Sequence, residues 1–216
     1  MKKRMFSLFL ALTLCLSLLP TGAWAAGIAP ERITLAGTAL ENGKSYIAAE
    51  SGITEKPDDS DETNYLTYAD GVLTVYGTVE VSCGESAGLS FYSGTLTLAG
   101  NGDLTIATSG SNSVVSGSPQ STLTTAEGFS GSITLGSVNA SAVQNVVLDL
   151  TTGGDILISS AKNSAVNTPQ NPVMLAGKTV TIKGAVETAE ASPANVSTVT
   201  APKLNVTAED GVTITG

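Results

Sequence analysis

The sequence of 216 residues contains no histidine, and only 5% of its residues are aromatic. Without histidine, the Ser-His-Asp and Cys-His hydrolase mechanisms are excluded, as are His-ligated zinc and haem sites. Hydrophobic residues still make up 42% of the chain, so small and β-branched side chains must fill the core. Basic residues are scarce too, with 10 Lys and Arg against 19 Asp and Glu. The net charge of −9 argues against a nucleic-acid partner, which would require a basic face.

The first 25 residues have the pattern of a bacterial secretory signal peptide. A basic start at residues 2–4 precedes an apolar run at residues 6–19, and a small-x-small cleavage site follows at residues 23–25. The apolar run is shorter than the ~20 residues that a membrane span needs. We therefore expect cleavage after Ala25, no membrane span in the mature chain, and a protein that is secreted or held at the cell surface.

Cysteine is nearly absent from the chain as well. Of the two cysteines, Cys15 lies in the predicted signal peptide, so Cys83 is the only thiol left for the mature chain. A single thiol cannot form an internal disulfide, and stability must come from packing and backbone hydrogen bonds. Cys83 follows Val79 and Val81 at alternate positions, which predicts a small buried side chain rather than a reactive thiol.

From residue 70 onward, the chain repeats a short apolar-polar-apolar phrase. The first residues of the successive copies are Val79, Leu104, Ile133, Ile156, Val180 and Leu204. They are spaced 25, 29, 23, 24 and 24 residues apart. A second phrase begins at Leu96, Leu123, Leu148, Val173 and Val199, and a fainter third one ends at Val115, Val143 and Val166. Three short extended segments that recur every ~24 residues are typical of a parallel β-helix, in which each repeat forms one coil. The alignment of the last repeat has an alternative. In it, Leu204 begins the second phrase, Val212 begins the first phrase, and an insertion lies near residues 185–194.

The repeat predicts an all-β, right-handed parallel β-helix, or β-solenoid. Alternating apolar residues give each short strand one buried face, and stacked coils bury those faces against one another. The alternative is a β-sandwich of the adhesin-like kind, whose strands also alternate but do not normally repeat one phrase at a fixed offset. The solenoid reading predicts that Leu104, Ile106, Ile133, Leu135, Ile156 and Ile158 point inward in stacked columns.

Residues 26–69 do not repeat and are expected to form an N-terminal cap region with an acidic loop at residues 55–62. Solenoids need such a cover over their first coil. Residues 70–216 then form the solenoid. Because the chain ends in mid-pattern after residues 212–215, we expect it to be a truncated chain or fragment.

The texture of these repeats resembles secreted β-helix repeat proteins of clostridia-like Gram-positive bacteria. The resemblance rests on the residues 70–77, Asp-Gly-Val-Leu-Thr-Val-Tyr-Gly, and 101–106, Asn-Gly-Asp-Leu-Thr-Ile, and covers about residues 33–216. Many such proteins are described as carbohydrate-binding domains or adhesin-like solenoids. The resemblance implies an extracellular, surface-associated solenoid with glycan binding, and it brings no catalytic motif.

Two sets of residues are candidates for binding. Sugar-binding modules commonly stack aromatic rings on a pyranose face, and the aromatic candidates for such contacts are Tyr65, Tyr68, Tyr76, Phe91 and Tyr92. The alternative for these side chains is that they pack the cap onto the first coils. The acidic loop offers a candidate calcium site, since clustered oxygen ligands suit that ion, with the ligands Asp58, Asp59, Asp61 and Glu62. A solvated loop is the alternative there.

The sequence favours a non-catalytic function. Asp103 and Asp155 hold the same repeat position, two coils apart, and a pair of carboxylates is what a glycosidase uses. Aspartate in this position is also ordinary turn chemistry, in which the carboxylate accepts backbone N–H bonds. We therefore predict an adhesin-like or weakly glycan-binding surface protein, whose partner is a polysaccharide or a host or cell-surface glycan. A polysaccharide lyase or glycoside hydrolase on the same fold is the alternative.

Overall fold

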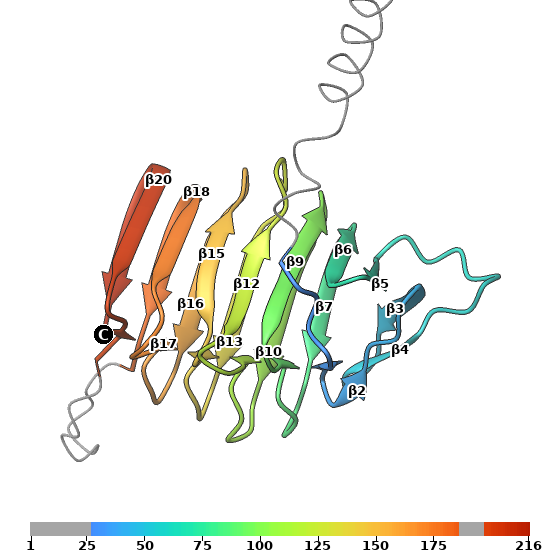
Figure 1. The fold of residues 1–216 in the computed structure, drawn as a ribbon, viewed down its shortest axis with the longest axis horizontal. Coiled ribbons are helices and arrows are strands. Elements are labelled where there is room, and N and C mark those ends of the chain that lie inside the picture. Colours follow the sequence, from blue (N-terminus) through green and yellow to red (C-terminus); the bar gives the residue numbers. More distant parts are fainter. Residues whose placement is uncertain (1–26, 186–196) are drawn as a thin grey trace, which may run out of the picture.

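The computed structural model describes residues 27–185 and 197–216. These residues form strands β1 to β20 and no helix, and their stacked parallel coils make a β-solenoid of about four turns (Figure 1). The predicted fold class is therefore confirmed, and the strands in the described part of the chain do not form two facing antiparallel sheets. The predicted signal peptide lies outside the described residues. Within the described residues, no helix is long and apolar enough to cross a membrane.

One side of the solenoid is built from the first repeated phrase. Its strands are β7 (Thr78–Ser82), β10 (Asp103–Thr108), β13 (Ile133–Ser137) and β16 (Ile156–Ser160), followed by the second halves of β18 (Val173–Lys183) and β20 (Leu204–Thr215). All neighbours on this side pair in parallel. The register aligns Val79, Leu104, Ile133, Ile156, Val180 and Val212 in one column.

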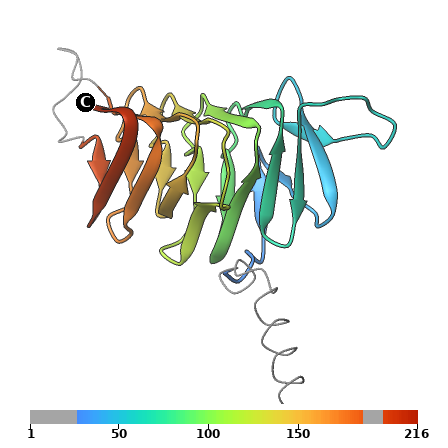
Figure 2. The same cartoon turned by 90° about the horizontal axis from the view of Figure 1, so that it is seen from above.

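The other two sides follow the same rule. The second phrase forms β9 (Gly94–Gly100), β12 (Ser121–Thr125), β15 (Val147–Thr151) and the first halves of β18 and β20, and β6 (Val72–Tyr76) pairs in parallel with β9. The third side is short and consists of β8 (Leu89–Phe91), β11 (Val115–Ser116), β14 (Val143–Gln144), β17 (Val166–Asn167) and β19 (Val199–Thr200). Figure 2 shows the coils lying side by side along the axis.

The core consists of the inward columns that the alternation predicts. Leu104, Leu135 and Ile156 are 1% exposed, and Ile106, Ile133 and Ile158 are fully buried. Outward neighbours such as Thr105, Thr134 and Leu157 align in the same strands and stay partly accessible. The two faces of each strand are therefore assigned correctly from the sequence. Cys83 is buried too, as predicted.

In the last coil, the alignment that placed Leu204 in the first phrase is wrong. Leu204 aligns with Val173 on the second side, and Val212 aligns with Val180 on the first. Val199 belongs to the third side, where it pairs with Val166. The distance from Val180 to Val212 is 32 residues, against 23 to 29 for the earlier coils, because additional chain precedes β19. The alternative register, with an insertion near residues 185–194, is confirmed by this alignment, although residues 186–196 lie outside the described residues.

A column of asparagines ties one corner of successive coils together. The Asn112 side-chain amide donates to the Glu85 carbonyl at 2.7 Å, that of Asn139 to the Ser109 carbonyl at 2.6 Å, and that of Asn163 to the Asn139 carbonyl at 2.9 Å. Each bond joins a corner to the corner one coil before it. The turns are therefore held by side-chain bonds as well as by the backbone ladders of the strands.

The N-terminal strands pair differently from the coils. β1 (Ile33–Leu35), β2 (Thr38–Ala39), β3 (Lys44–Ala48), β4 (Ile53–Glu55) and β5 (Tyr65–Ala69) form antiparallel pairs only. β1 lies antiparallel to β8 of the first coil. β3 pairs with β5 and β5 pairs with β6, so that these strands continue the second side of the solenoid. This antiparallel cap positions the candidate site.

Candidate functional site

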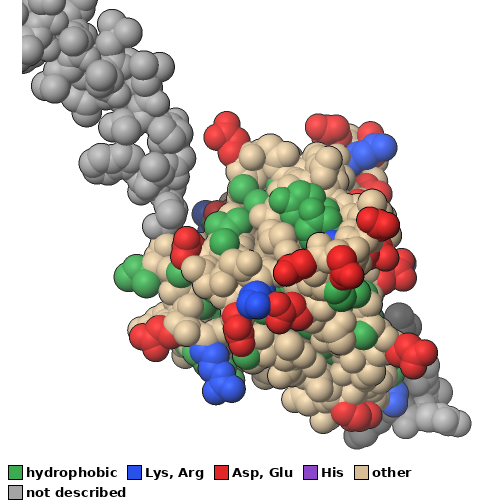
Figure 3. All heavy atoms as spheres, turned by 90° about the vertical axis from the view of Figure 1, so that its right-hand side faces the viewer, with side chains coloured by type: hydrophobic (Ala, Val, Ile, Leu, Met, Phe, Trp, Pro, Cys, Tyr) green, Lys and Arg blue, Asp and Glu red, His purple; other side chains and the backbone are tan. Residues whose placement is uncertain are grey.

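The candidate site lies on the antiparallel cap, at the end of the molecule that Figure 3 faces. A cleft of about 420 Å³ opens there between the start of β3 and the segment that follows β4. Its walls are mostly polar, and they consist of Asn42, Gly43, Lys44, Ser45, Glu55, Lys56, Pro57, Asp58 and Tyr65. Acidic side chains outnumber basic ones on this face, and the hydrophobic side chains form small patches (Figure 3).

Two of the predicted aromatic residues meet beside this cleft, and one of them, Tyr65, forms part of its wall. Tyr65 and Tyr76 lie opposite each other in the β5–β6 pair, and their rings stack with centroids 4.5 Å apart and planes inclined by 15°. Lys56 Nζ lies over the Tyr65 ring, 5.3 Å from its centroid. Because Tyr76 covers one face of Tyr65, this ammonium lies on the other face. The more accessible ring of the stack is therefore that of Tyr76, which is 37% exposed, whereas Tyr65 is partly buried.

Lysines and carboxylates alternate around the cleft. Lys44 Nζ lies 2.6 Å from Glu55 Oε1, in an ion pair between two half-exposed side chains. The hydrogen bond that Lys44 donates to Glu55, together with the negative charge of Glu55, raises the pKa of Lys44. Lys56 Nζ donates to the Ser60 carbonyl oxygen at 2.6 Å, which holds the loop after β4 against the Tyr65 ring. The site can thus offer hydrogen-bond donors and acceptors beside an aromatic surface.

The other three aromatic candidates are not part of this site. Phe91 is fully buried and Tyr68 is 6% exposed, so the expectation that they stack on a ligand is wrong. Both alternate with buried leucines, Leu89 and Leu66, and share their inward faces. For Tyr68, burial raises the pKa of the phenol.

Tyr92 is accessible but distant from the stack. It is 63% exposed and precedes the start of β9 at Gly94. Tyr76 follows Val75, which aligns with Gly100 at the far end of β9. Seven residues of strand separate the two ends, which is about 20 Å. The structure therefore brings together Tyr65 and Tyr76 and leaves Tyr92 apart.

The acidic loop between β4 and β5 does not gather its carboxylates. Within the described residues, no group of three or more His, Cys, Asp or Glu side chains is placed to hold a metal ion. Asp58, Asp59, Asp61 and Glu62 therefore do not converge into the calcium site that their sequence spacing suggested. Local hydrogen bonds shape the loop instead, with Glu62 Oε1 accepting from the Asn64 amide at 3.0 Å and the Ser60 amide donating to the Pro57 carbonyl at 3.0 Å.

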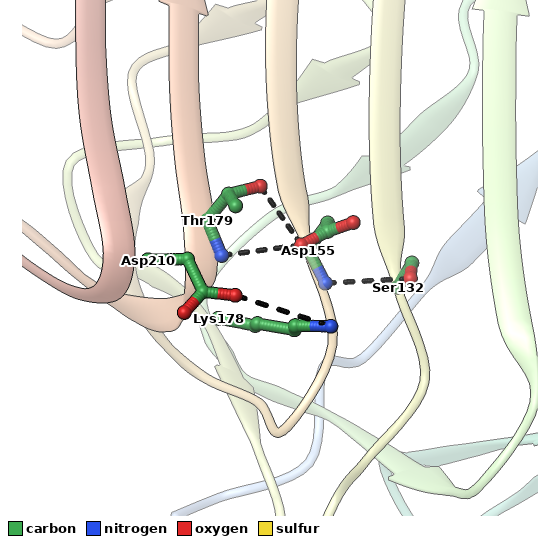
Figure 4. A network of polar contacts seen from close by, with 5 residues as sticks. All are labelled: Ser132, Asp155, Lys178, Thr179 and Asp210. Atoms are coloured by element: carbon green, nitrogen blue, oxygen red, sulfur yellow. Dashed lines mark hydrogen bonds and ion pairs between the residues drawn. The ribbon is translucent and has the colours of Figure 1, made fainter.

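The repeated aspartates at the start of the first-side strands accept hydrogen bonds from the backbone of the next coil, as Figure 4 shows for Asp155. Asp155 Oδ1 accepts from the Thr179 amide at 3.1 Å and from the Thr179 hydroxyl at 2.8 Å. Asp103 Oδ1 accepts from the Ser132 amide at 2.7 Å. Each carboxylate therefore bonds to the next coil, in the turn role that the sequence analysis preferred over a catalytic pair.

Sequence reasoning missed Lys44, Glu55 and Lys56 as site residues. They come from β3, from β4 and from the segment after it, and only the antiparallel pairing of the cap brings them next to Tyr65. The signal that could have found Lys44 and Lys56 is the scarcity of bases, since only seven remain after residue 26. Two of those seven line one cleft.

Fold and site together define the chain as a β-solenoid with an antiparallel cap that carries a shallow polar cleft and a stacked tyrosine pair. No protein-family model matches the sequence, and searches of curated proteins and of solved structures give no significant match.

Proposed function

We propose that this protein is a non-catalytic, adhesin-like surface protein of a bacterium, secreted by its signal peptide, which binds a glycan weakly at its capped end. The observation that carries the proposal is the stacked Tyr65–Tyr76 pair beside the polar cleft. Carbohydrates are bound by an apolar aromatic surface together with a few polar groups that bond their hydroxyls. The proposal places both at one location on the chain.

The geometry assigns different roles to the two rings. The accessible face of Tyr76 would contact the pyranose ring, whereas Tyr65 is held between Tyr76 and Lys56 and supports it. The Lys44–Glu55 pair and Asn42 would bond hydroxyl groups. Because the cleft is shallow and the aromatic surface is small, the affinity for each sugar should be weak, and several copies on a cell surface would be needed for firm attachment.

The bonding of Asp103 and Asp155 supports the non-catalytic part of the proposal. A glycosidase needs one carboxylic acid and one carboxylate that face the scissile bond. Here each aspartate accepts backbone N–H bonds from the next coil, at 2.7 Å for Asp103 and 3.1 Å for Asp155. Oδ1 of each aspartate is therefore already bonded to the backbone of the neighbouring coil.

Binding of polysaccharides to the purified protein, measured by affinity electrophoresis and calorimetry with and without calcium, tests the proposal. Tyr76→Ala should weaken binding at least tenfold, because it removes the accessible ring. Tyr92→Ala is the matched control, since it removes a more exposed tyrosine that lies away from the cleft. Loss of binding in Tyr92→Ala but not in Tyr76→Ala, or no binding to any glycan, would refute the proposed site.

A lyase or hydrolase of acidic polysaccharides is the second candidate function. The observation in its favour is that Lys44, Lys56, Glu55 and Asp58 line the same cleft, so that bases and carboxylates converge there. Release of reducing ends or unsaturated uronates from pectin-like and cellulosic substrates would reveal it. Turnover that is lost in Lys56→Met and Glu55→Gln would replace the binding proposal with this one.

A further inference from the structure

A second cleft, of about 350 Å³, adjoins the first cleft beside the stacked tyrosines. It lies between the segment that leads into β1, the chain around the end of β2, and the end of β5. Asn42 lines both clefts, and its side chain is fixed there by two hydrogen bonds. It donates to Asp70 Oδ1 at 3.1 Å and accepts from the Asp70 amide at 2.6 Å. A chain of sugars that occupies the first cleft can therefore continue past Asn42 into the second.

The second cleft differs from the first in having an apolar floor. Pro30 is buried, Ile33 is 3% exposed and Leu40 is 7% exposed, and all three contribute to its wall. The walls of the first cleft are mostly polar. An apolar wall with a few polar groups around it is the usual composition of a ligand site. This floor suits a ligand group that has a methyl or a similarly small apolar part.

The rim of the second cleft carries an arginine without an ionic partner. Arg32 is exposed, and it is the only arginine after residue 26. The ion pairs among the described residues are Lys44–Glu55 and Lys178–Asp210, so no carboxylate pairs with Arg32 in that part of the chain. Asp70, which lines the same cleft, is bonded to Asn42 instead. The guanidinium can thus donate to an oxygen atom of a ligand.

Charge decides which kind of oxygen fits this arginine. A carboxylate and an amide carbonyl can both accept hydrogen bonds from a guanidinium. Residues 27–85, which form the cap and β7, contain 11 Asp and Glu against 3 Lys and Arg, a net charge of −8. Figure 3 shows this surplus of acidic side chains on the capped end. Because such a field repels an acidic sugar, it favours the neutral carbonyl oxygen.

From these observations we propose that the second cleft binds the acetamido group of an N-acetylated amino sugar. The carbonyl oxygen of this group accepts from Arg32, and its methyl group lies against Ile33 and Leu40. The inference rests on the proposed glycan binding at the first cleft, because Asn42 connects the two. The ligand is then a chain of at least two sugars, with one beside Tyr76 and an N-acetylated one in the second cleft.

Oligosaccharides that differ in one substituent test this inference. Oligomers of N-acetylglucosamine and of glucose with the same linkage differ only in the acetamido group, and oligogalacturonate supplies the acidic case. In calorimetric titrations of the secreted protein, the N-acetylated oligomer should bind about fivefold or more tightly than the glucose oligomer. A buried methyl group alone accounts for about fourfold, and the hydrogen bond to Arg32 adds to it. Oligogalacturonate should bind more weakly than either.

The single arginine of the secreted protein makes the contact directly observable. The Nε–H signal of Arg32 in the NMR spectrum should shift with the N-acetylated oligomer and not with the glucose oligomer. Arg32→Met should reduce the affinity for the N-acetylated oligomer to that for the glucose oligomer. Lys162→Met is the matched control, since it removes the same charge from an exposed side chain outside the cap and should change neither affinity.

The Tyr76→Ala variant separates this inference from the proposed function. It should weaken the binding of both neutral oligomers. Equal affinities for these two oligomers, both lowered in Tyr76→Ala, would overturn the inference and leave the proposed function standing, as would tighter binding of oligogalacturonate. Binding of the N-acetylated oligomer that is lost in Arg32→Met but unchanged in Tyr76→Ala would keep the acetamido site and reject the Tyr76 site. Absence of binding to every oligomer overturns both.

Discussion

Replacing Ile156 by aspartate would place a carboxyl group in the middle of an inward column. Ile156 is 1% exposed and lies between Ile133 of the coil before it and Val180 of the coil after it. No basic side chain lies in this column, so the carboxylate would have no partner. The substitution therefore combines lost packing with burial of a charge.

The two effects differ in their dependence on pH. Loss of the isoleucine side chain and the resulting cavity should cost about 2–5 kcal/mol at any pH. The carboxyl group has a pKa of about 3.9 in the unfolded chain, and burial raises it in the folded chain. The charge penalty is therefore absent below about pH 4 and grows by about 1.4 kcal/mol per pH unit above it, to about 4 kcal/mol at pH 7. The sum approaches the total stability of a typical domain.

Chemical denaturation of Ile156→Asp at pH 4.5 and pH 7 measures both effects, and hydrogen exchange locates the damage. We expect a larger loss of stability at pH 7 and a loss of protection centred on β13, β16 and β18, because each coil contacts only its neighbours. Thr134→Asp is the control, since Thr134 lies on the outward face between Thr105 and Leu157 and should change stability by less than ~1 kcal/mol. Equal losses in the two variants, or a pH-independent loss in Ile156→Asp, would refute the assignment of inward and outward faces.

Three further predictions concern single side chains. Asp155→Ala should lower the free energy of unfolding by about 1–3 kcal/mol, because it leaves the Thr179 amide without its acceptor, while Asp149→Ala, on an exposed outward position, should have little effect in the same thermal melts. Asn163→Ala should cost about 1 kcal/mol through the lost bond to the Asn139 carbonyl, and an unchanged melting temperature would speak against the asparagine column. Burial raises the pKa of Cys83 from 9.0 to about 11, so the folded protein should resist alkylation at pH 8 and react once it is unfolded. Because the thiol loses its proton more readily in the unfolded chain, the wild-type protein should lose stability between pH 9 and 11 relative to Cys83→Ala. The loss should be at most about 3 kcal/mol, and chemical denaturation of both proteins at the two pH values measures it.

The solenoid could be predicted from the sequence because its determinants are local and repeated. Each coil restates the same alternation, so Leu104, Ile133 and Ile156 reveal both the strand and its buried face. The register of the last coil was ambiguous because additional chain before β19 breaks the period. The eight-residue offset between Leu204 and Val212 indicated the correct answer, since it recurs between Leu96 and Leu104.

The site was harder to predict because it is built by pairing that the sequence does not repeat. Tyr65 and Tyr76 meet through the β5–β6 hairpin, and the cleft needs β3 and β4 beside them. Composition alone ranked all five aromatic candidates equally. Alternation could have removed Tyr68, which is two residues after the buried Leu66, because it predicts that both point inward.

The antiparallel contact between β1 and β8 determines the order in which parts of the chain can fold during synthesis. One edge of β1 pairs at once with β2, but Ile33 aligns with Phe91 on the other edge, which has no strand to bond until nearly sixty further residues have left the ribosome. Every later strand of the coils finds its neighbour already in place, because that neighbour lies one repeat earlier in the chain. Closure of the cap is thus the step with the longest delay, and growth after it can keep pace with translation, one coil at a time.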